Sequence, residues 1–222
     1  MEEKELQSEL ASIRSIMERS SKFISLSGLS GILAGIYALI GAYVAYEILG
    51  EDATHVMVRS RMPVDTNAPV TGIFHNDGNI FDMIAIRLAI IALIVLIASV
   101  TTAILLSTRQ AKRKGQSMWG SVSRSLLFHM AVPLIAGGAF ILILLLRRHY
   151  GIVSPASLMF YGIALVSASN FTFADVKYLG LCEILLGLIA ACVPGYGLLF
   201  WAIGFGALHI IYGARIYLKY DK

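Results

Sequence analysis

The residues of this chain that could do chemistry are a few ionisable side chains inside long apolar segments. Glu183 lies in LGLCEILLGL, and His209 lies in FGALHIIYGA. An acid beside an imidazole can hold and pass on a proton or bind a cation. An ionisable group inside a membrane helix faces the protein interior by default and marks a functional site. Both residues are therefore candidates for a buried polar site.

Counting from the turn between their two segments predicts that Glu183 and His209 lie at the same height. The turn VPGYG centres near Gly195. The two side chains stand about 12 to 14 residues away on either side, which is roughly 19 to 20 Å at the helical rise. Small residues one turn away on both helices favour close contact. We predict a Glu183–His209 hydrogen bond.

Two further polar residues, His129 and Asn170, extend this site in the sequence-based interpretation. Both lie near the expected cytoplasmic ends of their segments, and Pro133 leaves the carbonyl of His129 without its helical donor. We predict one buried polar layer near the cytoplasmic side. It could be structural, since polar contacts tie membrane helices together, or it could carry a solute or protons. A metal held by His129, His209 and Glu183, or a cofactor, is the third interpretation.

A separate ionisable residue, Arg87, lies near the outer end of its apolar segment. A cation near a helix N-terminus opposes the helix dipole and needs a carboxylate partner. We predict an outer ion pair between Arg87 and Glu47, with Asp82 as the second candidate. The alternative is that Arg87 extends to water.

The elements that must position these residues are membrane helices. The 222-residue chain is 57% hydrophobic and only 14% charged, whereas soluble domains carry about 25% charge. A helix needs roughly 20 apolar residues to cross the hydrocarbon core. We predict an all-α integral membrane protein with a six-helix bundle over 23–222. Its expected spans are 23–49, 83–107, 125–146, 155–173, 178–193 and 197–217.

The distribution of basic residues predicts the orientation of this bundle. Thirteen of the 18 lysines and arginines fall in alternate connections and the two terminal segments, and four fall on the opposite side. The positive-inside bias then makes both termini cytoplasmic. The protein should lie in a cytoplasmic (inner) or plasma membrane. The same bias explains the net charge of +4 without nucleic-acid binding.

Three segments predict possible partners or further structure. Residues 1–22 are expected to form a short cytoplasmic helix whose apolar stripe, within 2–19, suits the bundle's own surface, a cytoplasmic protein or lipid. Ser27, Gly31 and Gly35 recur every four residues, which suits internal helix packing or a homo-oligomer seam. The outer loop 50–82 contains THVMVRSR and TGIF, a pattern that predicts a small β-hairpin.

These observations leave three classes of function open. The chain contains no P-loop, GxSxG, HExxH or CxxC motif, which favours a non-enzymatic role. A small-solute or proton-coupled transporter or channel would use the polar layer. An accessory or sensory membrane protein would use the N-terminal helix, and a membrane-embedded enzyme would need a metal or cofactor in the layer.

Overall fold

The computed structural model describes residues 27–60, 77–113 and 120–221, and positions 7 and 13 besides. The predicted helix 1–22 therefore lies outside the described residues, apart from these two positions, which are helical. The segment 2–19 proposed to meet a cytoplasmic partner lies outside them in the same way. Side chains are described for 27–50, 82–113 and 120–220, with those of positions 7 and 13.

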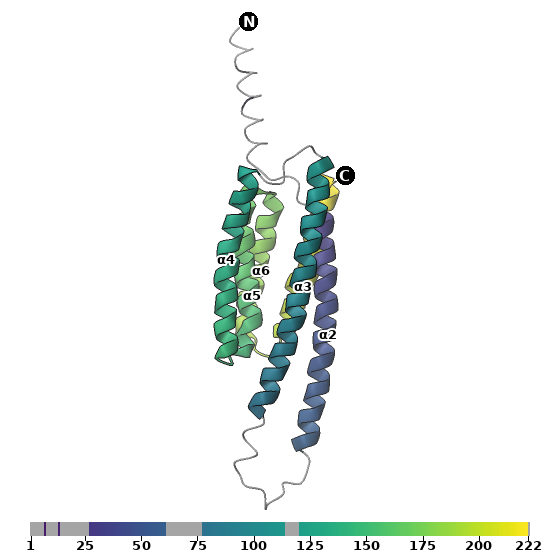
Figure 1. Cartoon of the computed structure of the whole chain (residues 1–222), viewed down its shortest axis with the longest axis vertical. Helices are drawn as coiled ribbons and strands as arrows, with labels where there is room; N and C mark the ends of the chain where they lie inside the picture. The colour runs from purple at the N-terminus through teal and green to yellow at the C-terminus, as the bar shows by residue number, and fades with distance from the viewer. Residues whose placement is uncertain (1–6, 8–12, 14–26, 61–76, 114–119, 222) are drawn as a thin grey trace, which may run out of the picture.

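The described part of the chain forms six helices, and no strand occurs in it (Figure 1). The last, which we call the C-terminal helix (residues 197–221), joins four consecutive helical segments. The helices are α2 (Gly28–Ser60), α3 (Asp77–Arg113), α4 (Ser121–Leu146), α5 (Val153–Ala168), α6 (Ala174–Cys192) and the C-terminal helix, made of α7 (Gly197–Trp201), η4 (Ala202–Leu208), α8 (His209–Ile216) and η5 (Tyr217–Asp221). Short turns η2 (Tyr150–Ile152) and η3 (Ser169–Phe171) flank α5.

Five of these helices are long and apolar enough to cross a membrane. They leave large apolar side chains such as Ile40, Ile94 and Ile135 more than half exposed, which suits contact with lipid rather than water. The sixth, α6, is not among these five and carries three charged residues, Asp175, Lys177 and Glu183. The expected membrane class is therefore confirmed at the level of five candidate spans.

Several helices extend beyond the apolar runs that predicted them. The first continues to Ser60 and the second begins at Asp77, so the predicted loop 50–82 is largely helical at its two ends. The β-hairpin prediction is wrong for THVMVRS, which lies within α2. Adding residues to a formed helix costs little, because each one gains a backbone hydrogen bond. A short polar–apolar alternation does not overcome that advantage.

The closest backbone contact joins α2 to the C-terminal helix. A Cβ on Gly31 would lie 3.1 Å from the Cα of Gly213, and one on Gly35 would lie 2.6 Å from the carbonyl oxygen of Gly206. Gly28 packs against the backbone of Tyr217 in the same seam. The small-residue pattern of Ser27, Gly31 and Gly35 thus serves packing within the chain, while the predicted homo-oligomer stays untested.

A second glycine seam joins α5 to α6. A Cβ on Gly162 would lie 2.6 Å from the carbonyl oxygen of Gly180, and one on Gly180 would lie 2.7 Å from that of Gly162. Gly187 packs just as closely on the backbone of Pro155 and Met159. Without side chains between them, the two helix backbones come close enough for extensive van der Waals contact.

The helices therefore divide into two groups (Figure 1). Group one contains α2, α3 and the C-terminal helix, with α3 packed along α2. Group two contains α4, α5 and α6, with α4 packed along α5. The C-terminal helix contacts both α5 and α6, so the seam between the groups runs along it. Two of the predicted site residues, Glu183 and His209, meet across this seam.

Candidate functional site

Glu183, His209 and Tyr161 form a polar cluster within the seam between the two groups. Glu183 is fully buried and His209 is 7% exposed. The Nδ1 atom of His209 lies 3.5 Å from Oε1 of Glu183, and its Nε2 atom lies 2.7 Å from the hydroxyl of Tyr161. The two side chains lie close together, but the predicted Glu183–His209 hydrogen bond is wrong, because neither oxygen of Glu183 has a hydrogen-bond partner among the described residues.

The site lies at mid-height in its helices and not near one end. Glu183 stands at the midpoint of α6 (Ala174–Cys192), and His209 stands at the midpoint of the C-terminal helix. Tyr161 lies near the middle of the span Tyr150–Phe171. The predicted location near the cytoplasmic side concerns depth in the membrane, which the midpoints of helices do not fix, so it stays a prediction.

The local backbone of the C-terminal helix makes room for the acid. Gly204 faces Glu183, and a Cβ on Gly204 would lie 2.5 Å from Oε2 of Glu183. Segment η4 has π-helical geometry, and Nδ1 of His209 lies 3.0 Å from the carbonyl oxygen of Gly204, five residues earlier. Single π-helical turns within α-helices are frequent at functional sites.

These contacts assign the protons of His209 in its neutral form. The Nδ1–H group donates to the carbonyl of Gly204, and Nε2 accepts from the hydroxyl of Tyr161. The carboxyl group of Glu183 receives no hydrogen bond from the residues that the structure describes, and burying an ionised carboxylate without one is very costly. A protonated Glu183 beside a neutral His209 is therefore the favoured resting state.

The other two predicted members of the polar layer lie elsewhere. His129 is exposed, with Nδ1 2.8 Å from the carbonyl oxygen of Ser125 and its ring 4.7 Å from that of Phe171. Asn170 is exposed and donates to the carbonyl of Ser167. The four-residue layer is wrong because both residues sit on outward faces of their helices, which counting along the chain does not reveal.

This arrangement removes His129 as the third ligand of the predicted metal site. His129 does not approach Glu183 or His209, and no three His, Cys, Asp or Glu side chains among the described residues could together hold a metal ion. Cys182 and Cys192 are free thiols. What the buried cluster can do on its own is bind, hold and transfer a proton.

The predicted outer ion pair stays a prediction. Glu47 accepts a hydrogen bond from Tyr43. Asp82 pairs with Arg148 at 2.7 Å and accepts a hydrogen bond from Tyr150. These contacts join α3 to the α4–α5 turn, where Arg148 has a left-handed backbone with φ of 59°. We call this group the Asp82 clamp.

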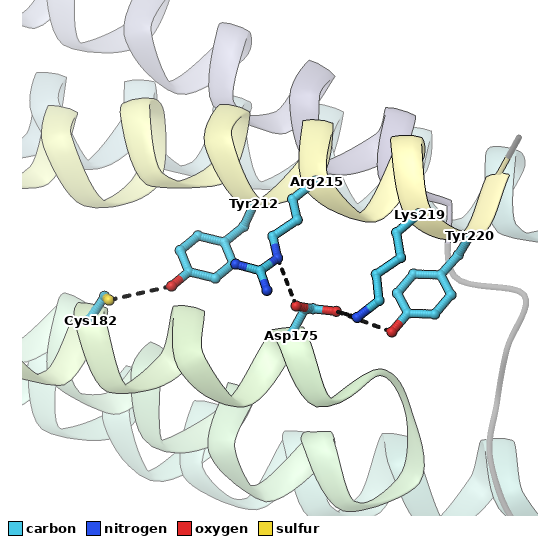
Figure 2. Close-up of polar contacts among 6 residues, drawn as sticks. All are labelled: Asp175, Cys182, Tyr212, Arg215, Lys219 and Tyr220. Atoms are coloured by element: carbon cyan, nitrogen blue, oxygen red, sulfur yellow. Dashed lines mark hydrogen bonds and ion pairs between the residues drawn. The ribbon is translucent and has the colours of Figure 1, made fainter.

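A second ion-pair cluster, which we call the Asp175 clamp, lies at the opposite end of the seam (Figure 2). Asp175, at the start of α6, is 2% exposed. Its two oxygens lie 3.0 Å from Nε of Arg215 and 3.1 Å from Nζ of Lys219, and Tyr220 also donates to it. The clamp joins α6 to the C-terminal helix.

Tyr161 and Asp175 are functional candidates that reasoning from the sequence missed. Asp175 was passed over because it precedes the apolar run that marked the fifth span. Its partners were visible, since Arg215 and Lys219 are four residues apart and share a helix face. Tyr161 carries no such signal, because a tyrosine within an apolar helix resembles ordinary packing.

The Asp175 clamp should make stability depend on pH in the acid range. Burial alone would raise the pKa of Asp175, but hydrogen bonds from Lys219 and Tyr220 and the nearby charges of Lys219 and Arg215 hold it below its ordinary value. The stabilisation is then present above the unfolded-state pKa and is lost as pH falls through the lower folded value. Its size should be about 1.5 to 3 kcal/mol, as for hydrogen bonds to charged groups.

Thermal unfolding of the wild type and of Asp175→Asn in detergent, measured against pH, tests this expectation. The wild type should be more stable at neutral pH, and the difference should shrink below about pH 4, where an unfolded aspartate becomes protonated. A difference that stays constant down to pH 2 would contradict the assignment.

Comparisons with known proteins add no relative to this description. No family model, curated protein or solved structure matches the chain. The buried cluster of Glu183, His209 and Tyr161 is therefore the basis for proposing a function.

Proposed function

We propose that this protein is a proton-coupled, transporter-like membrane protein of six spans. The observation that carries the proposal is the fully buried carboxyl group of Glu183, which lies 3.5 Å from His209 and has no hydrogen-bond partner within the described part of the chain. Such a group is costly in a structural role. Ionisable residues inside membrane helices that face one another typically form proton relays or solute pathways.

The position of the cluster supports the same function. Glu183, His209 and Tyr161 lie at or near the midpoints of three helices. Solute and coupling-ion sites of secondary transporters lie near the bilayer midplane, often where a helix departs from regular geometry. The π-helical segment η4, which faces Glu183 through Gly204, is a departure of this kind.

Six spans with both termini cytoplasmic is the topology we propose. The 19 residues of α6 extend about 28 Å, close to the hydrocarbon thickness. Two of its three charges, Asp175 and Lys177, lie in its first turn, where they reach the membrane surface. The start of α2 lies beside the end of the C-terminal helix, where Gly28 meets Tyr217. This neighbourhood and the basic residues of the terminal segments favour a cytoplasmic location for that end.

The proposed chemistry is reversible protonation at one buried site. In the resting state, Glu183 carries the proton and His209 is neutral. The Nδ1 atom of His209 that faces Glu183 already carries a hydrogen and donates it to Gly204, so His209 is not the acceptor and the proton of Glu183 leaves for water. Release of the proton to water leaves a buried carboxylate, which a small cationic solute can neutralise. Without that solute, the site can still take a proton from one side and release it to the other, and exchange of a proton for the solute would couple their movements.

Proton flux into proteoliposomes tests this proposal. Purified protein is reconstituted with a trapped pH-sensitive dye, and a potassium diffusion potential drives protons inward. We expect flux above that of empty vesicles for the wild type and loss of this flux for Glu183→Gln, because the amide cannot exchange a proton. Glu47→Gln is the matched control, since Glu47 is an exposed glutamate outside the cluster, and it should behave as wild type.

Infrared spectroscopy provides an independent readout of the same residue. A protonated carboxyl group in an apolar site has its own C=O stretching band, which Glu183→Gln should remove and Glu47→Gln should keep. Flux by Glu183→Gln equal to that of the wild type would overturn the proposal.

A further inference from the structure

We infer that the Asp175 clamp and the Asp82 clamp are two gates that open alternately, at opposite ends of the seam between the two helix groups. The inference rests on the proposed function, because it concerns access to the same buried site. Glu183 is fully buried, so neither a proton nor a solute can reach it from water unless the seam opens.

The contrast between the seams supports movement of the two groups as rigid bodies. Within each group, one pair of helices meets backbone to backbone through glycines, at Gly31 and Gly213 in group one and at Gly162 and Gly180 in group two. Across the seam between the groups, the glycines of the C-terminal helix meet side chains, those of Glu183 and Leu158 at Gly204 and that of Ser154 at Gly197. Backbone packing at glycines leaves little freedom, whereas ion pairs and hydrogen bonds between side chains can break and re-form as a unit.

The Asp175 end of the seam is closed in this structure. Arg215 and Lys219 hold the buried Asp175 while their own side chains are 61% and 53% exposed. An apolar cluster lies beside the clamp and combines Leu165 of α5, Ile216 of α8 and three residues at the start of α6, namely Phe173, Val176 and Leu179. Water can therefore reach Arg215 and Lys219 but not the carboxylate of Asp175.

The Asp82 end is held by a different pair of elements. Asp82 of α3 belongs to group one, and Arg148 and Tyr150 belong to the turn between α4 and α5 in group two. The side chains of Arg148 and Asp82 are 59% and 32% exposed. Each end of the seam thus has one acid–base clamp joining the two groups, with Glu183 and His209 between them.

Two natural cysteines allow the gates to be tested separately. Cys182 precedes Glu183 on α6, and its sulfur lies 3.7 Å from the hydroxyl of Tyr212 in the seam (Figure 2). Cys192 is exposed at the far end of α6. The rate at which a water-soluble methanethiosulfonate cation modifies Cys182 reports opening at the Asp175 end. In a matched chain that keeps Cys192 as its single thiol, the rate of Cys192 modification reports changes in exposure that do not depend on the gates.

The experiment uses full-length protein in nanodiscs, with Cys192→Ser leaving Cys182 as the single thiol. Asp175→Asn should raise the rate of Cys182 modification roughly tenfold, the population change that about 1.4 kcal/mol produces. Asp82→Asn should leave that rate at or below the wild-type value, because opening the other end closes this one. Neither change should alter the rate at Cys192 by more than about twofold, which corresponds to less than 0.5 kcal/mol.

Equal acceleration of Cys182 by Asp175→Asn and Asp82→Asn would overturn the inference, as would no acceleration by Asp175→Asn. If Asp175→Asn does not fold to a monodisperse protein, the double change Arg215→Gln with Lys219→Gln opens the same clamp from its exposed side and decides the result. Thiol modification contains no proton measurement. The two failures can therefore be told apart. Loss of proton flux in Glu183→Gln without the expected acceleration at Cys182 would overturn the gates and keep the proposed function. Equal proton flux in Glu183→Gln and the wild type would overturn the proposed function.

Discussion

Replacing Glu183 with methionine is expected to make the protein more stable while removing its proton flux. Methionine has a similar length and fills the same space, and it has no polar atom to leave unsatisfied. The neutral His209 keeps both of its hydrogen bonds, to Gly204 and to Tyr161. An unsatisfied buried polar group costs about 1 to 3 kcal/mol in mutational data. For a chain of this length, each kcal/mol corresponds to about 2 to 4 °C in the unfolding midpoint.

The measurement is thermal unfolding in detergent, with proton flux measured on the same preparation. Leu158→Met is the matched control, because Leu158 is also fully buried and lies beside the same site at Gly204. Exchanging leucine for methionine at constant volume usually costs less than about 1.5 kcal/mol. A loss of stability in Glu183→Met larger than that of Leu158→Met would mean that Glu183 supports the fold.

Replacing Gly213 with leucine is expected to separate α2 from the C-terminal helix. A Cβ at this position would lie 2.6 Å from the backbone nitrogen of Ile32 and 2.9 Å from the carbonyl oxygen of Gly28. Both contacts are backbone atoms, which cannot move aside as a flexible side chain can. The loss should be about 3 kcal/mol or more, at the upper end of the range for overpacking.

Gly138→Leu is the control for this change. Gly138 lies within α4, and a Cβ there would meet no atom within 4 Å. The added side chain should enter lipid and change stability little. Thermal unfolding and size-exclusion profiles of the two variants decide the outcome. Equal stability of Gly213→Leu and Gly138→Leu would show that the glycine seam does not hold group one together.

The sequence predicted that Glu183 and His209 lie level with each other, because their distances from the VPGYG turn depend only on the helical rise. It could not predict which way side chains face around a helix when all sides are apolar. His129 and Asn170 were therefore placed in the site although both are exposed. In a membrane helix without a polar face, the apolar pattern that orients a soluble helix is missing.

Helix ends and local irregularities were also beyond the sequence. The apolar run predicted that the fifth helix begins at residue 178, whereas α6 begins at Ala174. Asp175 therefore lies inside this helix, where its side chain is buried. The π-helical segment η4 depends on how the glycines of the C-terminal helix pack against Glu183 and Leu158. Packing between distant segments decides such a feature, and local propensity does not.

The left-handed backbone of Arg148 makes the two ends of the seam unequal. A residue with a Cβ at φ of 59° carries a conformational cost of roughly 1 to 2 kcal/mol. The contacts of Arg148 and Tyr150 with Asp82 offset this cost, so breaking them lets the turn relax. No such release accompanies rupture of the contacts to Asp175. On energetic grounds, the Asp82 clamp should therefore open before the Asp175 clamp, and the buried site would first become accessible from the end of the seam at the α4–α5 turn.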